Sequence, residues 1–96
     1  MDALEALGDP TRRRVVELLS TGERTAGEIA DAFPQSRPAM SRHLRLLREA
    51  GIVTSRAEGT RRVYALNRAP LADLEQWLSQ RLDALDTELR RTNRAR

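Results

Sequence analysis

Hydrophobic and polar residues recur with helical spacing most clearly between Ser36 and Gly51. Met40, Leu44 and Leu47 follow one another at intervals of four and three residues. Because successive helical residues lie about 100° apart, these side chains form one apolar face. The other face is polar and carries Arg37, Ser41, Arg42, Arg45 and Arg48. The pattern predicts an amphipathic helix with a core side and a cationic side.

Both ends of this predicted helix carry recognisable signals. Ser36 is a favourable N-cap residue, and Pro38 falls in the first turn, where its missing N–H costs no helical hydrogen bond. Gly51 readily takes the left-handed conformation that ends a helix. The helix is therefore expected to begin after Ser36 and to end before Gly51.

Two helices are predicted near the N-terminus. A short one covers residues 2–8 and contributes Leu4 and Leu7, and a second begins at Asp9-Pro10, a cap followed by a first-turn proline. Three arginines follow in the first turns of the second helix, a position that the helix dipole disfavours for cations. We favour solvent exposure, or pairing with nearby acids, over contact with a phosphate or a partner for Arg12, Arg13 and Arg14.

A helix-turn-helix is predicted over about residues 25–50. Thr25 and Glu28 have the spacing of a capping box, so a third helix is expected over residues 26–33, with a short strand near Arg24 before it. A proline then ends this helix, and only a brief turn remains before the amphipathic helix. A short helix, a tight turn and a longer polar-faced helix make this motif.

A wing is predicted over about residues 52–67. Two β-prone segments, 52–58 and 61–67, flank a turn at Gly59, as in a β-hairpin. Three arginines lie near its tip: Arg56, Arg61 and Arg62. Arginines in this position could contact the minor groove or the phosphates of DNA. The alternative is an edge hairpin kept soluble by its charges. Tyr64 is expected to pack between the wing and the core.

A long final helix is predicted over about residues 70–91, followed by a basic tail expected to fray. Its leucine stripe consists of Leu71, Leu74, Leu78, Leu82, Leu85 and Leu89, with Trp77 beside it. The first half is expected to pack on the core, whereas the half from about Leu82 has no surface of its own to cover. A homodimer is therefore predicted. Its expected interface consists of Leu4, Leu7, Leu78, Leu82, Leu85 and Leu89.

Composition narrows the class of protein. The chain has 96 residues, of which 40% are apolar and 32% charged, as in a single globular domain. The elements predicted above make this domain mainly α with a small β-hairpin. There is no cysteine, so disulfides and thiolate sites are excluded. No segment has the features of a secretion signal or a membrane span, which leads us to expect a cytoplasmic protein with no membrane partner.

The positive charges are concentrated in the middle of the chain. All 17 basic residues are arginine, and residues 36–68 carry eight of them against two acids. Residues 1–35 carry four arginines against seven acids. Such a run is often only a solvated surface. Here one helix and one hairpin share it, which favours a nucleic-acid-binding surface and double-stranded DNA as the partner.

Three segments together resemble a known family. LGDPTRRRVVELL, SRPAMSRHLRLLREAGIV and RAEGTRRVYAL are similar to the ArsR/SmtB family of bacterial winged helix-turn-helix repressors, over about residues 6–66. The resemblance implies a homodimer joined by the first and last helices and released from operator DNA by some signal. It places the base-reading positions on Arg37, Pro38, Ser41 and Arg42. We expect Arg45 and Arg48 nearer the phosphates, and a bacterial protein associated with the nucleoid.

The chain departs from the metal-sensing members of this family. Residues 25–31 lack the cysteine pair of the arsenic and cadmium sensors, and residues 71–96 lack the histidines of the zinc sensors. No metal or other cofactor is therefore expected. Pro34 stands where the family's turn usually has glycine. His43 lies on the apolar arc of the amphipathic helix, where we favour a packed residue bonded to backbone over a ligand or a pH switch.

The prediction is a sequence-specific DNA-binding transcriptional regulator, a dimeric repressor that binds an inverted repeat. The alternative is a winged-helix protein interaction module without operator binding. An enzyme is the weakest candidate, because the chain offers no nucleophile and base pair and no glycine-rich phosphate loop. Nothing in the sequence specifies a small-molecule or protein effector.

Overall fold

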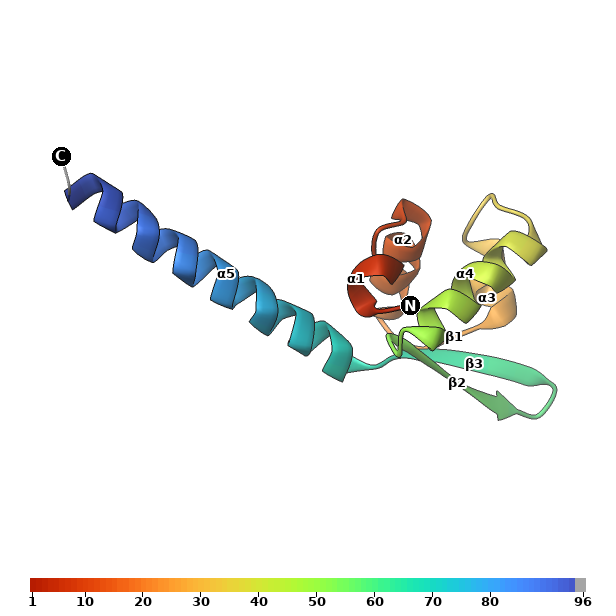
Figure 1. Ribbon diagram of the computed structural model, residues 1–96. Helices are drawn as coiled ribbons and strands as arrows, with labels where there is room; N and C mark the ends of the chain where they lie inside the picture. The colour runs from red at the N-terminus through yellow and green to blue at the C-terminus, as the bar shows by residue number, and fades with distance from the viewer. Residues whose placement is uncertain (95–96) are drawn as a thin grey trace.

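Helices α1–α4 and a small sheet form a body from which α5 projects as a long arm (Figure 1). The computed structural model describes residues 1–94. The elements in chain order are α1 (Ala3–Ala6), α2 (Pro10–Leu19), β1 (Arg24–Thr25), α3 (Ala26–Asp31), α4 (Arg37–Glu49), β2 (Val53–Glu58), β3 (Arg61–Leu66) and α5 (Arg68–Arg94). The predicted order of helices and strands is confirmed, including the short strand before α3.

The core lies between α2, α3, α4 and the root of the sheet. Its fully buried side chains come from each of these parts and include Val15, Ile29, Met40, Leu47 and Ile52. Leu44 is buried beside Met40 and Leu47, so the apolar face predicted for α4 is confirmed. Burial of this face holds α4 against the body with its polar side outward.

The predicted ends of α4 are also confirmed. The Ser36 Oγ accepts a hydrogen bond from the Ala39 N–H at 3.3 Å. At the other end Gly51 has φ +75°, a left-handed value that favours glycine. The Gly51 N–H donates to the Arg48 carbonyl at 2.9 Å, and the Ile52 N–H donates to the Leu47 carbonyl at 3.0 Å. These bonds turn the chain directly from α4 into β2.

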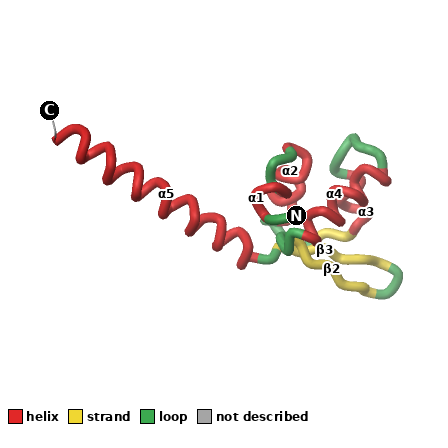
Figure 2. Tube along the Cα trace, viewed as in Figure 1, coloured by secondary structure: helices red, strands yellow, loops and turns green. Residues whose placement is uncertain are grey.

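The wing is part of a three-stranded antiparallel sheet with strand order β1-β3-β2 (Figure 2). Glu58 lies opposite Arg61 at the tip, and Arg24 of β1 lies opposite Tyr64. The turn between β2 and β3 contains Gly59 with φ +60°, which a hairpin turn of this length requires. Tyr64 is buried, as predicted for a side chain between wing and core.

Two predicted boundaries differ from the structure. The third helix ends at Asp31 rather than Phe33, because the chain already turns ahead of Pro34. The last helix begins at Arg68, not at Pro70, since Asn67 caps it by accepting from the Ala69 N–H at 3.4 Å. Proline is tolerated in the first turn, so it did not mark the first helical residue.

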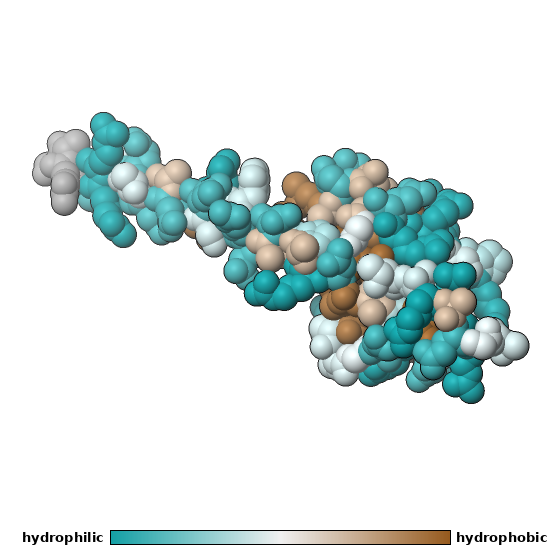
Figure 3. Space-filling model, turned by 90° about the horizontal axis from the view of Figure 1, so that it is seen from below, coloured by the Kyte–Doolittle hydropathy of each residue, from teal (hydrophilic) through white to brown (hydrophobic). Residues whose placement is uncertain are grey.

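Helix α5 packs on the body only at its start. Leu71 contacts the core, but the exposed stretch of the stripe begins at Trp77, which is 47% exposed, and not at Leu82 as predicted. Figure 3 shows hydrophobic surface gathered where α5 joins the body. The helix continues as far as Arg94, past the predicted end at residue 91. Of the predicted basic tail, residues 95–96 lie outside the described residues.

Candidate nucleic-acid interface

The polar side of α4 forms one continuous exposed arc. It faces away from the buried side chains of Met40, Leu44 and Leu47. All six residues predicted to contact DNA from this helix are exposed: Arg37, Pro38, Ser41, Arg42, Arg45 and Arg48. The structure therefore brings together the positions that the sequence placed on the cationic face.

One hydroxyl connects this arc to the wing. The Ser55 Oγ accepts hydrogen bonds from Nη1 of Arg48, at 3.4 Å, and from Nη1 of Arg62, at 3.0 Å. Arg48 belongs to α4 and Arg62 to β3, so Ser55 links two guanidinium groups from different elements. We call these three residues the Ser55 bridge. The bridge makes the α4 arc and one face of the wing a single cationic surface.

Arg56 lies on the other side of the wing and is paired with acids. Its guanidinium donates to both carboxylate oxygens of Glu23, at 3.0 and 2.8 Å, and to Glu58 at 3.0 Å. The two-pronged bond from Arg56 lowers the pKa of Glu23 and raises that of Arg56. Glu23 precedes β1, so this contact ties the wing to the loop that follows α2.

Strand geometry separates the three wing arginines that the sequence grouped at the tip. Side chains alternate between the two faces of a strand, and directly opposed residues share a face. Ser55 opposes Tyr64, and Arg62 shares their face, toward α4. Arg61 is the neighbour of Arg62 and therefore projects from the opposite face. The α4 side of the wing thus presents one of the three arginines.

Arg45 of α4 is held only by a weak ion pair. The Nε of Arg45 lies 3.9 Å from Oε1 of Glu49, one turn later, and both side chains are more than half exposed. Exposed pairs of this kind contribute about 0.3–0.5 kcal/mol. Arg45 can exchange this carboxylate for a phosphate at little cost.

His43 has polar side-chain neighbours that sequence reasoning did not anticipate. Its Nδ1 lies 3.8 Å from Oδ2 of Asp9 and 3.5 Å from Nη1 of Arg12. The ring is partly buried between α4 and the start of α2, so these side chains, not backbone groups, are its polar contacts. The Arg12 N–H, assisted by the charges of His43 and Arg12, lowers the pKa of Asp9.

Arg13 and Arg14 of α2 are exposed, as expected, whereas Arg12 is half-buried; Arg12 and Arg13 also bond to backbone carbonyls, which was not expected. Nε of Arg12 donates to the Ala6 carbonyl at 2.6 Å, and Nη1 of Arg13 donates to the Leu7 carbonyl at 2.8 Å. Carbonyls at the end of a helix lack helical partners and carry its negative dipole. Arg12 and Arg13 therefore hold the end of α1 against α2.

The turn before α4 has a tether that the sequence does not signal. Nε2 of Gln35 donates to Oγ1 of Thr11 at 3.1 Å, across the space between the turn and α2. Thr11 is the one buried polar residue among the described residues. Gln35 fixes the N-terminal end of α4, where Arg37 and Ser41 project, without using a turn glycine.

The predicted interface residues occupy a second surface. Leu4, Leu78, Leu82, Leu85 and Leu89 are all exposed. Leu7 is different, because it is half-buried and packs against the core.

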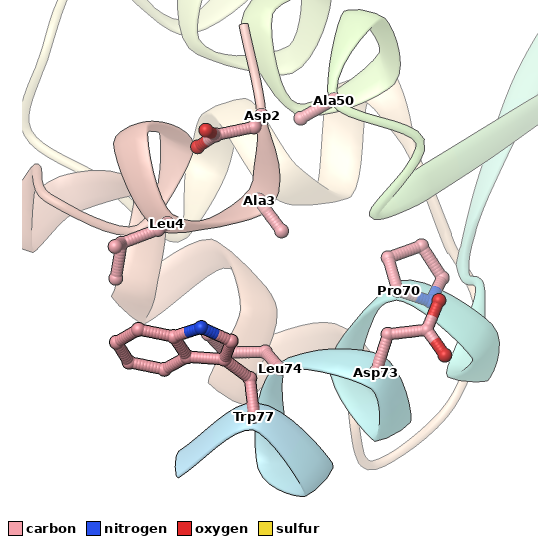
Figure 4. Close-up of a pocket in the computed structure, with 8 residues that line it drawn as sticks. All are labelled: Asp2, Ala3, Leu4, Ala50, Pro70, Asp73, Leu74 and Trp77. Atoms are coloured by element: carbon pink, nitrogen blue, oxygen red, sulfur yellow. The ribbon is translucent and has the colours of Figure 1, made fainter. Parts of the chain in front are cut away.

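A groove of about 410 Å³ lies between α1 and α5. Figure 4 shows Ala3 and Leu4 on one side of it and Leu74 and Trp77 on the other. Asp2 and Asp73 contribute the acidic part of its lining.

Two negative observations apply to residues 1–94. No group of three or more His, Asp or Glu side chains is arranged to hold a metal ion within this range. No helix in the described part of the chain has both the length and the apolar character needed to cross a membrane.

Comparison with known proteins identifies the family. A family profile described as a helix-turn-helix domain matches residues 7–56. The transcriptional repressor SdpR of Bacillus subtilis (strain 168) is 35% identical over 88 residues, covering 92% of this chain and 98% of SdpR. A solved ArsR family transcriptional regulator superposes with a TM-score of 0.81 at 31% identity, covering 86% of each chain. This protein belongs to the ArsR/SmtB family.

A further relative supports the same assignment. The HTH-type transcriptional regulator Rv2034 of Mycobacterium tuberculosis is 50% identical over 72 residues, covering 75% of this ArsR/SmtB member and 67% of Rv2034. Named repressors among the relatives, together with the exposed arginine arc on α4, make this family member a DNA-binding transcriptional regulator.

Proposed function

We propose that this ArsR/SmtB member is a homodimeric repressor whose two α4 helices enter successive major grooves of an inverted-repeat operator. The exposed arc of α4, joined to the wing by the Ser55 bridge, carries the proposal. Dimerisation through α5 and α1 supplies the second α4 helix. Two such helices about 34 Å apart read half-sites one helical turn apart.

The roles divide along the arc. Arg37 and Arg42 make bidentate contacts to guanine, with Pro38 and Ser41 against neighbouring base edges. Arg45 and Arg48 lie closer to the end of α4 and contact phosphates. On the wing, Arg62 contacts the backbone beside the α4 site. Arg61 reaches the backbone from the other face, and Arg56 adds positive charge to the extent that Glu23 releases it.

A gel-shift titration on DNA from the protein's own promoter region tests the proposal. Binding should weaken by a factor of 10³ or more between about 50 and 200 mM salt, because each phosphate contact releases counterions. Arg42→Ala should reduce affinity at least about 30-fold, because each of the two half-sites loses a bidentate contact worth about 1–3 kcal/mol.

Arg14→Ala is the matched control. It removes the same charge from an exposed position on α2, outside the α4 arc and the wing. Equal losses from Arg14→Ala and Arg42→Ala would contradict base reading by α4. Absence of any salt-sensitive shift would contradict operator binding and favour a protein interaction module.

A further inference from the structure

We propose that Glu23 occupies, in the free protein, the site on Arg56 that a DNA phosphate takes in the complex, and thereby limits the affinity of the wing for DNA. This inference rests on the proposed operator binding and names a residue that determines its strength. It follows from the geometry of the Glu23–Arg56 pair, from the second acid beside it and from the exposure of all three side chains.

The contact between Glu23 and Arg56 has the geometry of an arginine–phosphate contact. Nη1 and Nη2 of Arg56 donate to separate carboxylate oxygens of Glu23, at 3.0 and 2.8 Å. The planar guanidinium fork fits a carboxylate and a phosphate with the same two parallel hydrogen bonds. While this pair is intact, the two donors that a phosphate would need are in use. Glu23 and DNA therefore compete for the same edge of the guanidinium.

A second carboxylate converges on this guanidinium. Glu58 lies directly opposite Arg61 in the strand register, yet its Oε2 accepts from Nη2 of Arg56, at 3.0 Å, on its own strand. Within residues 1–94, Arg56 is the one wing arginine that pairs with acids. Two negative charges and one positive charge leave the cluster of Glu23, Arg56 and Glu58 with a net charge of −1. Such a cluster repels the DNA backbone until Arg56 is released.

The Glu23–Arg56 pair is not needed to hold the wing in place. Strand β1 follows Glu23 directly and is already hydrogen-bonded to β3 through its backbone. The side chains of Glu23 and Arg56 are each 51% exposed, and that of Glu58 is 64% exposed. Exposed ion pairs contribute little to the stability of a fold. Removal of the Glu23 carboxylate should therefore leave the protein folded.

The same exposure allows the DNA backbone to displace the carboxylate. An exposed pair of this kind changes an equilibrium constant by at most about fivefold. Double-stranded DNA presents about one negative charge per 1.7 Å of helix axis, so a phosphate is always within reach of a docked wing. After the exchange the Glu23 carboxylate stays beside the DNA and repels it. Both the broken pair and this repulsion lower the affinity.

Glu23→Gln tests the inference, because it removes the charge of Glu23 and keeps the size of the side chain. Affinity for DNA from the protein's own promoter region should rise roughly 4- to 25-fold, since each subunit of the proposed dimer loses a competitor worth about two- to fivefold. Gel-shift titrations at one salt concentration measure the gain. Glu17→Gln is the matched control, because it makes the same charge change at an exposed position of α2. It should change affinity less than about twofold.

Unrelated DNA gives a second measurement. Phosphate contacts carry no sequence information, so Glu23→Gln should raise affinity for unrelated DNA by the same factor as for promoter DNA. The ratio of the two affinities should stay at the wild-type value. A gain confined to promoter DNA would show that the released Arg56 reads a base, and would overturn the assignment of Glu23 as a competitor of phosphate.

A double-mutant cycle shows whether the gain acts through Arg56. In the Arg56→Ala background, Glu23→Gln should raise affinity no more than about twofold, because only its repulsion of the DNA remains. An equal gain in both backgrounds would show that Glu23 acts by general repulsion. That result would overturn the inference.

The other outcomes are equally decisive. Unchanged affinity of Glu23→Gln would show that Glu23 does not compete with DNA, and a reduced affinity would show that it positions the wing for DNA instead. Loss of folding of Glu23→Gln in circular dichroism would show that the pair is structural. Each of these results overturns the inference while leaving operator binding intact. Absence of DNA binding by the unaltered protein would overturn the proposed function itself.

Discussion

The arginine surface of α4 and the leucine surface of α5 differ in the free energy of their exposure to water. The α4 arc exposes arginines, which are well solvated and cost nothing to display in an isolated chain. The distal half of α5 exposes Leu78, Leu82, Leu85 and Leu89, each about half accessible. Burying one such side chain fully is worth roughly 1.5–3 kcal/mol. The leucine surface therefore gains free energy from any partner that covers it, whereas the arginine surface gains free energy only from an anionic partner.

The comparison shows how the fold divides its tasks. The arginine surface is fixed by the body, through the core side of α4 and the Ser55 bridge. The leucine surface extends beyond the body, where only another macromolecule can cover it. Each surface can therefore be changed without unfolding the other, and substitutions should reveal this independence.

The largest effect is expected from a charge within the leucine stripe. Leu82→Asp places a carboxylate in the middle of the exposed leucines of α5, so the proposed dimerisation should be lost. Affinity for a two-half-site operator should then fall at least about 100-fold, because the second half-site is no longer bound intramolecularly. Sedimentation and gel shift measure the two losses. Gln80→Asp, on the opposite side of α5, should change neither, and circular dichroism should show both variants folded.

A smaller effect should distinguish the two faces of the wing. Arg62→Ala removes a cation from the α4 side of each subunit and should lower DNA affinity about 10-fold, with a reduction of about two in the salt slope because the proposed dimer loses two phosphate contacts. Arg56→Ala should cost less affinity, because Glu23 and Glu58 already neutralise Arg56. Gel shifts at several salt concentrations compare the variants. A larger loss from Arg56→Ala than from Arg62→Ala would show that strand faces do not determine the contact.

A third variant tests how much the contact between α1 and α2 stabilises the fold. Arg12 holds the end of α1, which borders the groove, and also lies beside His43 of α4. Arg12→Met removes the bond to the Ala6 carbonyl and should lower the free energy of unfolding by about 1–2 kcal/mol. Urea denaturation measures this change, with Arg14→Met as the exposed control. Equal stability of the two variants would mean that the Ala6 bond contributes nothing.

The smallest effect concerns acid. The folded protein lowers the pKa of Asp9, so this carboxylate stabilises the fold above its ordinary pKa of about 4. That contribution is lost as the pH falls through the lowered value. Asp9→Asn keeps an oxygen for the Arg12 N–H but has no charge. This substitution should lower the free energy of unfolding by less than about 1 kcal/mol at neutral pH. It should also make the fall of stability at acidic pH less steep. Thermal unfolding of both proteins from pH 2 to 7 measures this effect. An equal loss of stability with falling pH in the wild-type protein and in Asp9→Asn would contradict the prediction.

The sequence predicted best what depends on neighbouring residues. Ser36 and Gly51 act within a few residues of themselves, so both ends of α4 followed from local rules. The start of α5 was misplaced because Pro70 is a strong signal for a first turn but does not say which residue of that turn it occupies. Asn67, two residues before the expected cap, performs the capping.

Contacts between distant residues were not predictable from one sequence. Glu23 and Arg56 are 33 positions apart, and Arg12 and His43 are 31 apart. No periodicity or motif links such pairs, since the fold alone brings them together. The division of the wing arginines between two faces was accessible in principle, because Arg61 and Arg62 are adjacent in a strand. It required the strand register, which only the structure supplied.

Asn67 is the point at which α5 is anchored to the body. Its N–H donates to the Ile52 carbonyl at 2.8 Å, and its side chain donates to the Gly51 carbonyl at 3.0 Å, so one residue anchors the root of α5 to the end of α4. An arm of 27 residues is about 40 Å long. A tilt of about 5° at this root displaces the far end of an arm of that length by roughly 3.5 Å. In the proposed dimer, a slight angular change at Asn67 would therefore shift the two α4 helices relative to the half-sites that they read.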